Sequence, residues 1–188
     1  ASGRWQLFGT PALVFHISGG TTDLLLCNGV TVQQTLGTSL DLYAGQAVDR
    51  IGVKLGFPFP AGEHLSRLAA ECPQQPRVKA VLKGMNCHLS GLENQCSALL
   101  DKGYPPAYVA KYCLCTVGET VFRMVEAAYA AGFRLPVVCA GGVMSSQIVR
   151  DYVTARLRDV CFVPGQFASD NAIGVAIIAA KEVGAWPM

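Results

Sequence analysis

The stretch Ser18–Thr22 combines residue types suited to gripping phosphate. It reads S-G-G-T-T and is followed at once by a carboxylate, Asp23. Adjacent glycines let backbone N–H groups point outward and let a ligand come close, and the hydroxyls add donors of their own. The stretch joins two apolar runs, Ala12–Ile17 and Leu24–Cys27, so the simplest alternative is a plain hairpin with a Gly-Gly turn. These residues alone leave both interpretations open.

Two further turns are centred on glycine, at Gly141-Gly142 and in the loop Pro60–Gly62. The first of them directly follows a buried apolar run, which is where ligands bind in open α/β sheets. Gly141-Gly142 would let a base or ribose lie against the backbone, although a tight strand-to-helix turn explains it equally well. We expect Ser18–Thr22, Gly62 and Gly141-Gly142 to come together on one side of the domain.

Several carboxylates could support such a site. Asp41 and Asp49 are eight residues apart in a predicted helix over Leu40–Leu55, so they roughly share a face. That face could meet a ligand hydroxyl or a metal, or could simply be solvated. Asp170 precedes Asn171 at another predicted helix start, where capping of the helix is the simpler role and metal ligation the alternative.

Other site types find little support. The chain has no GxSxG, no HExxH and no GxxxxGK[ST] motif. Its three histidines, at 16, 64 and 88, are not at ligand spacing, and His16 is interpreted as a structural residue of the first strand. The eight cysteines form no CxxC pair, which argues against a zinc ribbon and favours buried, reduced thiols of a cytosolic protein.

Composition sets the outer bounds. The chain has 188 residues, of which 51% are hydrophobic, and this composition predicts one domain with a hydrophobic core. Its net charge of only +2 gives no case for tight nucleic-acid binding by this chain alone. Ala1–Thr10 lacks a signal-peptide pattern, and no run of about 18 apolar residues suggests a membrane span. We expect a cytoplasmic location without membrane contact. The chain begins a few residues before a core strand, as an excised domain would.

Hydrophobic periodicity and turn residues predict one α/β domain over residues 1–188, with an antiparallel meander followed by parallel strands in one mixed sheet. The predicted strands are Ala12–Ile17, Leu24–Cys27, Val30–Leu36, Arg77–Leu82, Met85–Leu89, Pro136–Ala140 and Val160–Val163. The predicted helices are Leu40–Leu55, Glu63–Glu71, Leu92–Lys102 with Ser90 as N-cap, Ala107–Ala131, Ser145–Arg158 and a last one from Ser169 or Asp170 to Val183.

Six short motifs follow one another in a fixed order. They read S-G-G-x-T, L-D-x-x-A-G-x-A-x-D-[KR], L-G-[FL]-x-[FY]-P-x-G, L-S-G-L, A-G-G-V and D-N, between about Pro11 and Gly184. Each motif is weak by itself, but the order and the gaps together are specific. The chain resembles the glycoprotease-like family, the tRNA threonylcarbamoyladenosine-synthesis proteins once named O-sialoglycoprotein endopeptidases. Protease activity has no support in these residues.

The resemblance implies an actin/Hsp70/sugar-kinase-like (ribonuclease H-like) fold of two lobes around a nucleotide cleft, with this chain as the C-terminal lobe. It implies binding of ATP or an adenylate, and a divalent metal (iron, zinc or magnesium) only in a longer chain that carries the family's upstream HxxxH pair beside Asp170. The nucleotide-binding residues that it implies are Ser18, Gly19, Gly20, Thr21, Thr22, Asp41, Gly45, Gly62, Gly141 and Gly142.

The chain also departs from the family pattern. The residues typical of the family, several of them polar, are replaced here by Thr21, Leu42, Gln46, Ala61, Glu93-Asn94 and Ser146. This thinned polar lining predicts a diverged paralogue that does not turn over as an isolated lobe. The leading hypothesis is nucleotide binding on a threonylcarbamoyltransferase scaffold, with tRNA bound only through a larger complex. The alternatives are a non-catalytic assembly partner, paired with a paralogous subunit or a second copy, and another phosphotransferase of the same superfamily.

Overall fold

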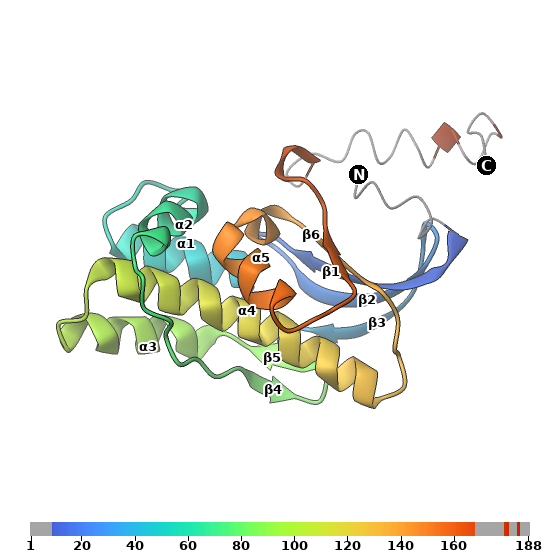
Figure 1. Ribbon diagram of the computed structural model, residues 1–188, viewed down its shortest axis with the longest axis horizontal. Coiled ribbons are helices and arrows are strands. Elements are labelled where there is room, and N and C mark those ends of the chain that lie inside the picture. Colours follow the sequence, from blue (N-terminus) through green and yellow to red (C-terminus); the bar gives the residue numbers. More distant parts are fainter. Residues whose placement is uncertain (1–8, 168–178, 181–183, 185–188) are drawn as a thin grey trace.

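A five-stranded mixed sheet lies beside a group of helices (Figure 1). The computed structural model describes residues 9–167, 179–180 and 184. The strand order is β3-β2-β1-β6-β7. The strands are β1 Pro11–Ile17, β2 Thr22–Asn28, β3 Thr31–Thr38, β6 Val137–Ala140 and β7 Val160–Phe162. β1, β2 and β3 pair antiparallel, whereas β6 and β7 are added parallel to β1. The predicted mixed sheet is therefore confirmed.

Helices gather around one long helix, α4. The helices are α1 Ala44–Lys54, α2 Gly62–Ala70, α3 Ser90–Asp101, α4 Pro106–Ala130 and α5 Gln147–Thr154, with short 3-10 turns η2 Gly142–Ser145 and η3 Gly165–Phe167. A small hairpin is made by β4 Val81–Lys83 and β5 Asn86–His88. α4 contacts α1, α2, α3 and α5. Its residues are therefore buried on several sides, as expected of a central helix.

A single hydrophobic core joins the sheet to these helices. Leu13, Phe15 and Ile17 alternate along β1 and are fully buried, because alternate side chains of a strand point to the same face. They share one core cluster with Val117 and Met124 of α4. Burying each such side chain stabilises the fold by roughly 1.5–3 kcal/mol. This packing holds the ends of β1 and β6, where the site is built.

The first helix begins later than its periodicity predicts. The expected start was Leu40, but α1 begins at Ala44, and the side chains of Leu40 and Tyr43 are 46% and 38% exposed. The cause is Asp41, whose carboxylate accepts the backbone N–H groups of Leu42 and of the distant Leu89. These bonds hold residue 41 in a loop, so it cannot share a helix face with Asp49, and that prediction was wrong.

The same contact changes the start of α3. Ser90 was predicted to cap this helix, but it is the first helical residue, and no side chain caps the helix. Its hydroxyl instead donates to Asp41 at 2.6 Å. The helix predicted over Ser145–Arg158 is shorter than expected, because Ser145 still belongs to the turn η2 and α5 spans only Gln147–Thr154. The helix expected after Asp170 lies outside the described residues.

Seven cysteines are buried free thiols, at positions 27, 72, 87, 96, 113, 115 and 139. Burial raises the pKa of the Cys139 thiol above its usual value, so that group stays neutral near pH 7. The burial of these seven cysteines confirms the expectation of buried thiols. Over the residues that the structure describes, no helix is long and apolar enough to cross a membrane.

Candidate functional site

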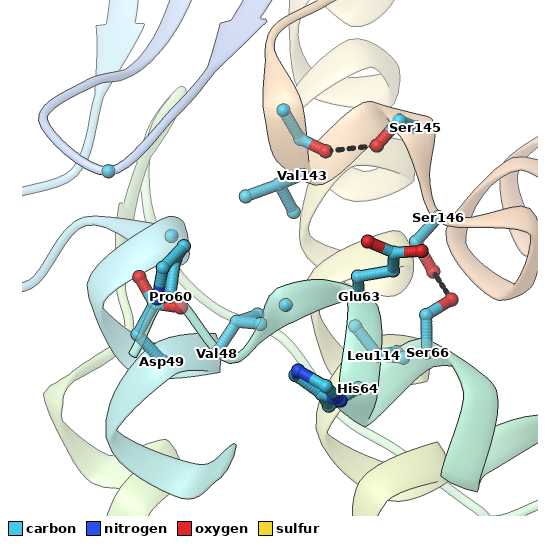
Figure 2. A pocket seen from close by; sticks show the side chains of 14 residues that line it. Val48, Asp49, Pro60, Glu63, His64, Ser66, Leu114, Val143, Ser145 and Ser146 are labelled. Atoms are coloured by element: carbon cyan, nitrogen blue, oxygen red, sulfur yellow. Dashed lines mark hydrogen bonds between the residues drawn. The ribbon is translucent and has the colours of Figure 1, made fainter. Parts of the chain in front are cut away.

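A cavity of about 420 Å³ opens where the glycine turns meet (Figure 2). It lies between the β1–β2 hairpin, α1, the start of α2 and the turn after β6. The lining residues are Gly19, Gly45, Val48, Asp49, Pro60, Gly62, Glu63, His64, Ser66, Leu114, Gly142, Val143, Ser145 and Ser146. A volume of this size falls within the range of small-molecule pockets in proteins.

The sheet topology explains why distant turns converge here. β1 and β6 are parallel neighbours, with His16 opposite Ala140 near their carboxyl ends. The turns that follow them therefore leave the same edge of the sheet, where ligands bind in open α/β folds. Gly19 and Gly142 thus line one cavity together with Gly62. The expectation that these three turns meet on one side of the domain is confirmed.

Two glycines of the predicted set shape the cavity by close packing. A Cβ atom on Gly45 would lie 2.4 Å from the carbonyl oxygen of Ser18, and one on Gly141 would lie 2.0 Å from that of Ile17. Gly141 also has a φ of 100°, a left-handed conformation that glycine adopts without steric cost. Both positions bring backbone directly against the end of β1.

The hydroxyls of the hairpin are largely occupied by one another. Ser18 Oγ lies 2.8 Å from Thr21 Oγ1 and accepts the backbone N–H of Gly20 at 3.2 Å. Thr21 Oγ1 lies 2.8 Å from Nδ1 of His16, which fits the structural role expected of that histidine. Thr22 is 1% exposed, and its hydroxyl donates to the Thr21 carbonyl and accepts the backbone N–H of Ala44. The hairpin therefore lines the cavity with the backbone of Gly19 and not with its hydroxyl groups.

Asp41 does not line this cavity. Its carboxylate accepts hydrogen bonds from the N–H groups of Leu42 and Leu89 at 2.6 and 2.7 Å and from Ser90 Oγ, and it lies 3.2 Å from Nδ1 of His88. Partial burial acts to raise the pKa of this carboxyl, but these hydrogen bonds outweigh it and hold the pKa well below its usual range. Asp41 is thus an ionised anchor that ties the loop before α1 to the start of α3.

Asp49 is the carboxylate that does reach the cavity from α1. Its Oδ1 atom accepts the backbone N–H of Ala61 at 2.8 Å, just after the cis peptide bond between Phe59 and Pro60. One carboxylate oxygen therefore holds the Pro60–Gly62 loop in place. Its other oxygen can accept a ligand hydroxyl.

Further polar groups come from α2 and η2. Ser66 and Ser146 share a hydrogen bond of 2.8 Å that joins α2 to the turn before α5, and Ser145 Oγ donates to the Gly142 carbonyl. Figure 2 shows the Glu63 carboxylate pointing toward the side that carries Ser146. Sequence reasoning missed Glu63, Ser66 and Ser145. Glu63 alone left a signal, since it directly follows Gly62 at a helix start.

The charge of the lining limits what the cavity can bind. Among its described lining residues are two carboxylates, Asp49 and Glu63, and no lysine or arginine. Ribose hydroxyls are suitable donors to such carboxylates, whereas a triphosphate would be repelled unless a cation neutralised it. Within the described residues, no group of three His, Cys, Asp or Glu side chains is placed to hold a metal ion. Asp170, the predicted metal ligand, lies outside them.

Comparison with known proteins identifies the family. A family profile described as tRNA N6-adenosine threonylcarbamoyltransferase matches residues 2–177. The chain belongs to this family. The threonylcarbamoyltransferase of Thermus thermophilus is 30% identical over 173 residues, which cover 90% of this chain and 53% of that protein. The one from Anaeromyxobacter dehalogenans is 34% identical over 181 residues, covering 89% and 54%. The chain therefore spans about half the length of these threonylcarbamoyltransferases.

Solved structures confirm the predicted fold. HypF in its phosphate- and nucleotide-bound form superposes with a TM-score of 0.72 at 15% identity, over 94% of this chain and 34% of that one. Component A of the Acidaminococcus fermentans (R)-2-hydroxyglutaryl-CoA dehydratase has a TM-score of 0.66 at 20% identity, over 92% and 62%. Both share the actin-like fold, so this member of the threonylcarbamoyltransferase family has that fold too.

Proposed function

We propose that the cavity binds the nucleoside portion of an adenylate, and that the chain is the C-terminal lobe of a tRNA adenosine threonylcarbamoyltransferase. The observation that carries the proposal is the convergence of Gly19, Gly62 and Gly142 with the carboxylates of Asp49 and Glu63 in one cavity. Glycine backbone allows close approach of a flat base or a ribose. The carboxylates accept hydrogen bonds from ribose hydroxyls, which favours an adenylate over ATP without a cation.

The reaction proposed for the complete protein is transfer of a threonylcarbamoyl group from its adenylate to the exocyclic amine of a tRNA adenosine. The amine nitrogen attacks the carbamoyl carbonyl carbon, the bond from that carbon to the phosphate oxygen breaks, and AMP leaves while the amine loses a proton. A divalent metal held by Asp170 and upstream histidines would supply Lewis-acid assistance. The residues described here bind and orient the adenylate, and tRNA reaches it through a larger complex, so the lobe alone does not turn over.

Glycines with open space beside them provide the test. A Cβ on Gly142 would meet nothing within 4 Å, so Gly142→Leu places bulk in the cavity without disturbing the fold. Gly91 of α3 provides a matched control, since a Cβ there would meet only Gln95 Nε2 at 3.8 Å. Calorimetric titration with AMP should show binding that Gly142→Leu weakens by at least about tenfold and that Gly91→Leu leaves unchanged. Equal affinity in all three proteins, or no AMP binding at all, contradicts the proposal.

A second candidate is an assembly role, favoured by apolar side chains in and beside α1. Leu40, Tyr43, Val53 and Phe59 are all exposed large hydrophobic residues. We infer that they contribute to one contact, either with a paralogous subunit or with a second copy, since exposed apolar side chains that form a contiguous patch mark protein–protein contacts. If the protein forms homodimers through this surface, Val53→Glu should shift its mass in light scattering from dimer to monomer.

A further inference from the structure

A second cavity, of about 520 Å³, lies between α4, α5 and the segment that follows α2. Its lining residues are Gln75, Pro76, Lys111, Cys115, Ile148, Asp151, Tyr152, Ala155 and Arg156. Among the described residues, none lines both this cavity and the glycine-rich one. The two cavities therefore have distinct sets of lining residues.

The first unusual feature of this cavity is the buried ammonium group of Lys111. Its residue is 7% exposed, and its Nζ atom donates to the backbone carbonyl of Cys72. An ammonium group carries three donors, and none of the ion pairs found among the described residues includes Lys111. Burying a cation is costly unless an anion accompanies it, so this group has capacity for an anionic partner.

The acidic groups nearby do not supply that partner. Glu119 is bound to Arg123 at 2.7 Å, to the Tyr152 hydroxyl at 3.0 Å and to Arg156 at 3.9 Å. Asp151 is exposed and accepts a hydrogen bond from Gln147 at 2.7 Å. Neither carboxylate pairs with Lys111.

The neighbouring thiol does not neutralise Lys111 either. Cys115 lies one helical turn beyond Lys111 and also lines the cavity. Burial raises its pKa to about 11, although the cations of Lys111 and Arg156 act in the other direction. The thiol is therefore uncharged at pH 7. Lys111 is thus a buried residue that lines the cavity, and no ion pair found among the described residues includes it.

Arg156 adds a second cation with a rigid geometry. Its guanidinium lies 3.6 Å from the centre of the Tyr152 ring, and its Nη1 atom donates to the Tyr152 carbonyl. Stacking on the ring holds the planar group in place, and a guanidinium matches the shape of carboxylate and phosphate groups. Pro76, Ile148 and Ala155 contribute apolar surface beside the two cations.

We propose that this cavity is a binding site for a small organic oxyanion, a carboxylate or phosphate monoester with an apolar body. Lys111 and Arg156 bind the oxyanion, and the apolar body lies against Pro76 and Ile148. The site is independent of the nucleotide site proposed above. A purely structural alternative is that Lys111 only clamps the Cys72 carbonyl just beyond the end of α2, where a cation is favourable. The two roles predict different effects of added ligand.

The test uses ligands that differ only in the charged group. Benzoate and phenyl phosphate carry the same apolar ring with different oxyanions, and benzyl alcohol is the uncharged counterpart. Calorimetric titration of the protein should give a dissociation constant of about 1 mM or tighter for at least one oxyanion, and no binding of benzyl alcohol in that range. The tighter of the two oxyanions identifies the headgroup that the site prefers.

Three variants locate the binding. Lys111→Met keeps the aliphatic length without the charge and should weaken oxyanion binding by at least about tenfold. Arg156→Gln should weaken oxyanion binding by a similar factor. Because the Arg156 side chain is 38% exposed, this variant should fold even if Lys111→Met does not, and it then tests oxyanion binding by itself. Lys102→Met removes an exposed lysine at the end of α3 and should change nothing.

Two outcomes overturn the proposal. One is an oxyanion affinity that is the same in the original protein and in both cavity variants, and the other is the absence of binding by either oxyanion at concentrations of about 10 mM. Gly142→Leu separates this site from the nucleotide site, since it should weaken AMP binding by at least about tenfold and leave oxyanion binding intact. Loss of oxyanion binding in Gly142→Leu would place the oxyanion in the first cavity and would also overturn the proposal.

Discussion

Removal of the Asp41 carboxylate should destabilise the protein without affecting ligand binding. In Asp41→Ala, the N–H groups of Leu42 and Leu89 and the hydroxyl of Ser90 lose their acceptor, and the bonds at 2.6, 2.7 and 2.6 Å disappear. Each hydrogen bond to a charged acceptor contributes about 1.5–3 kcal/mol. Since the three bonds share one acceptor and the Ser90 hydroxyl can turn to water, their contributions do not add in full, and we expect the free energy of unfolding to fall by about 3 kcal/mol in total.

Equilibrium unfolding in urea at pH 7 measures this loss, and a protein of this size should also show a melting temperature lowered by about 6–12 °C. Asp101→Ala provides the control, because that aspartate is exposed at the end of α3 and should change the free energy by less than about 0.5 kcal/mol. An unchanged unfolding midpoint in Asp41→Ala would refute the anchoring role. A weakened AMP affinity with unchanged stability would instead return Asp41 to the nucleotide site.

The pH dependence offers a second measurement on the same residue. The pKa of Asp41 is lowered in the folded state, so its ionised form is stabilised by folding, and that stabilisation is complete above the unfolded pKa of about 4. It is lost as pH falls from there toward the lower folded pKa. Asp41→Asn mimics the protonated group, so the stability difference between this variant and the original protein should shrink below about pH 4. A difference that grows on acidification would contradict the assigned direction of the pKa shift.

Three further changes test other parts of the structure. Gly141→Ala should lower the free energy of unfolding, measured in urea, by about 2 kcal/mol or more, because the added Cβ meets the Ile17 carbonyl at a position of positive φ. Gly142→Ala is the control: it has open space beside it and should change the free energy of unfolding by less than about 0.5 kcal/mol. Burial and, after it, the hydrogen bond to Glu119 raise the pKa of Tyr152 to about 12. Glu119→Gln should therefore lower the pKa of Tyr152 in an ultraviolet titration of the phenol, and an unchanged pKa would mean that burial acts alone. The seven buried thiols should react with a thiol reagent in urea much faster than in the native protein, and equal rates would show that the helical core opens readily.

The sequence allowed good prediction of those parts of the fold that depend on local pattern. Apolar runs and glycine turns predicted the meander, the parallel strands and the meeting of Gly19, Gly62 and Gly142, because strand order follows from connection rules. The start of α1 could not be predicted in this way. It depends on a hydrogen bond between Asp41 and Leu89, which are 48 residues apart, and the local hydrophobic periodicity gives no sign of such a long-range contact.

The polar side of the site was harder to predict for a similar reason. Ser66 and Ser146 meet across 80 residues, and nothing in either local stretch indicates the pairing. Lys111 illustrates the same limit, since no other charged residue stands near it in the sequence of the first half of α4, residues 106–118. Only the packing of α5 and the segment after α2 against α4 shows that Lys111 lines a cavity.

The backbone contacts at Gly45 and Gly141 separate the shape of the first cavity from its chemistry. The cavity's form depends on main chain pressed against main chain at Ser18 and Ile17, whereas its selectivity depends on side chains such as Glu63 and Ser66. The protein is therefore a suitable template for redesigning ligand preference. Residues of the second group can be exchanged in a library while the two glycines are kept, and most members should fold and differ only in what they bind.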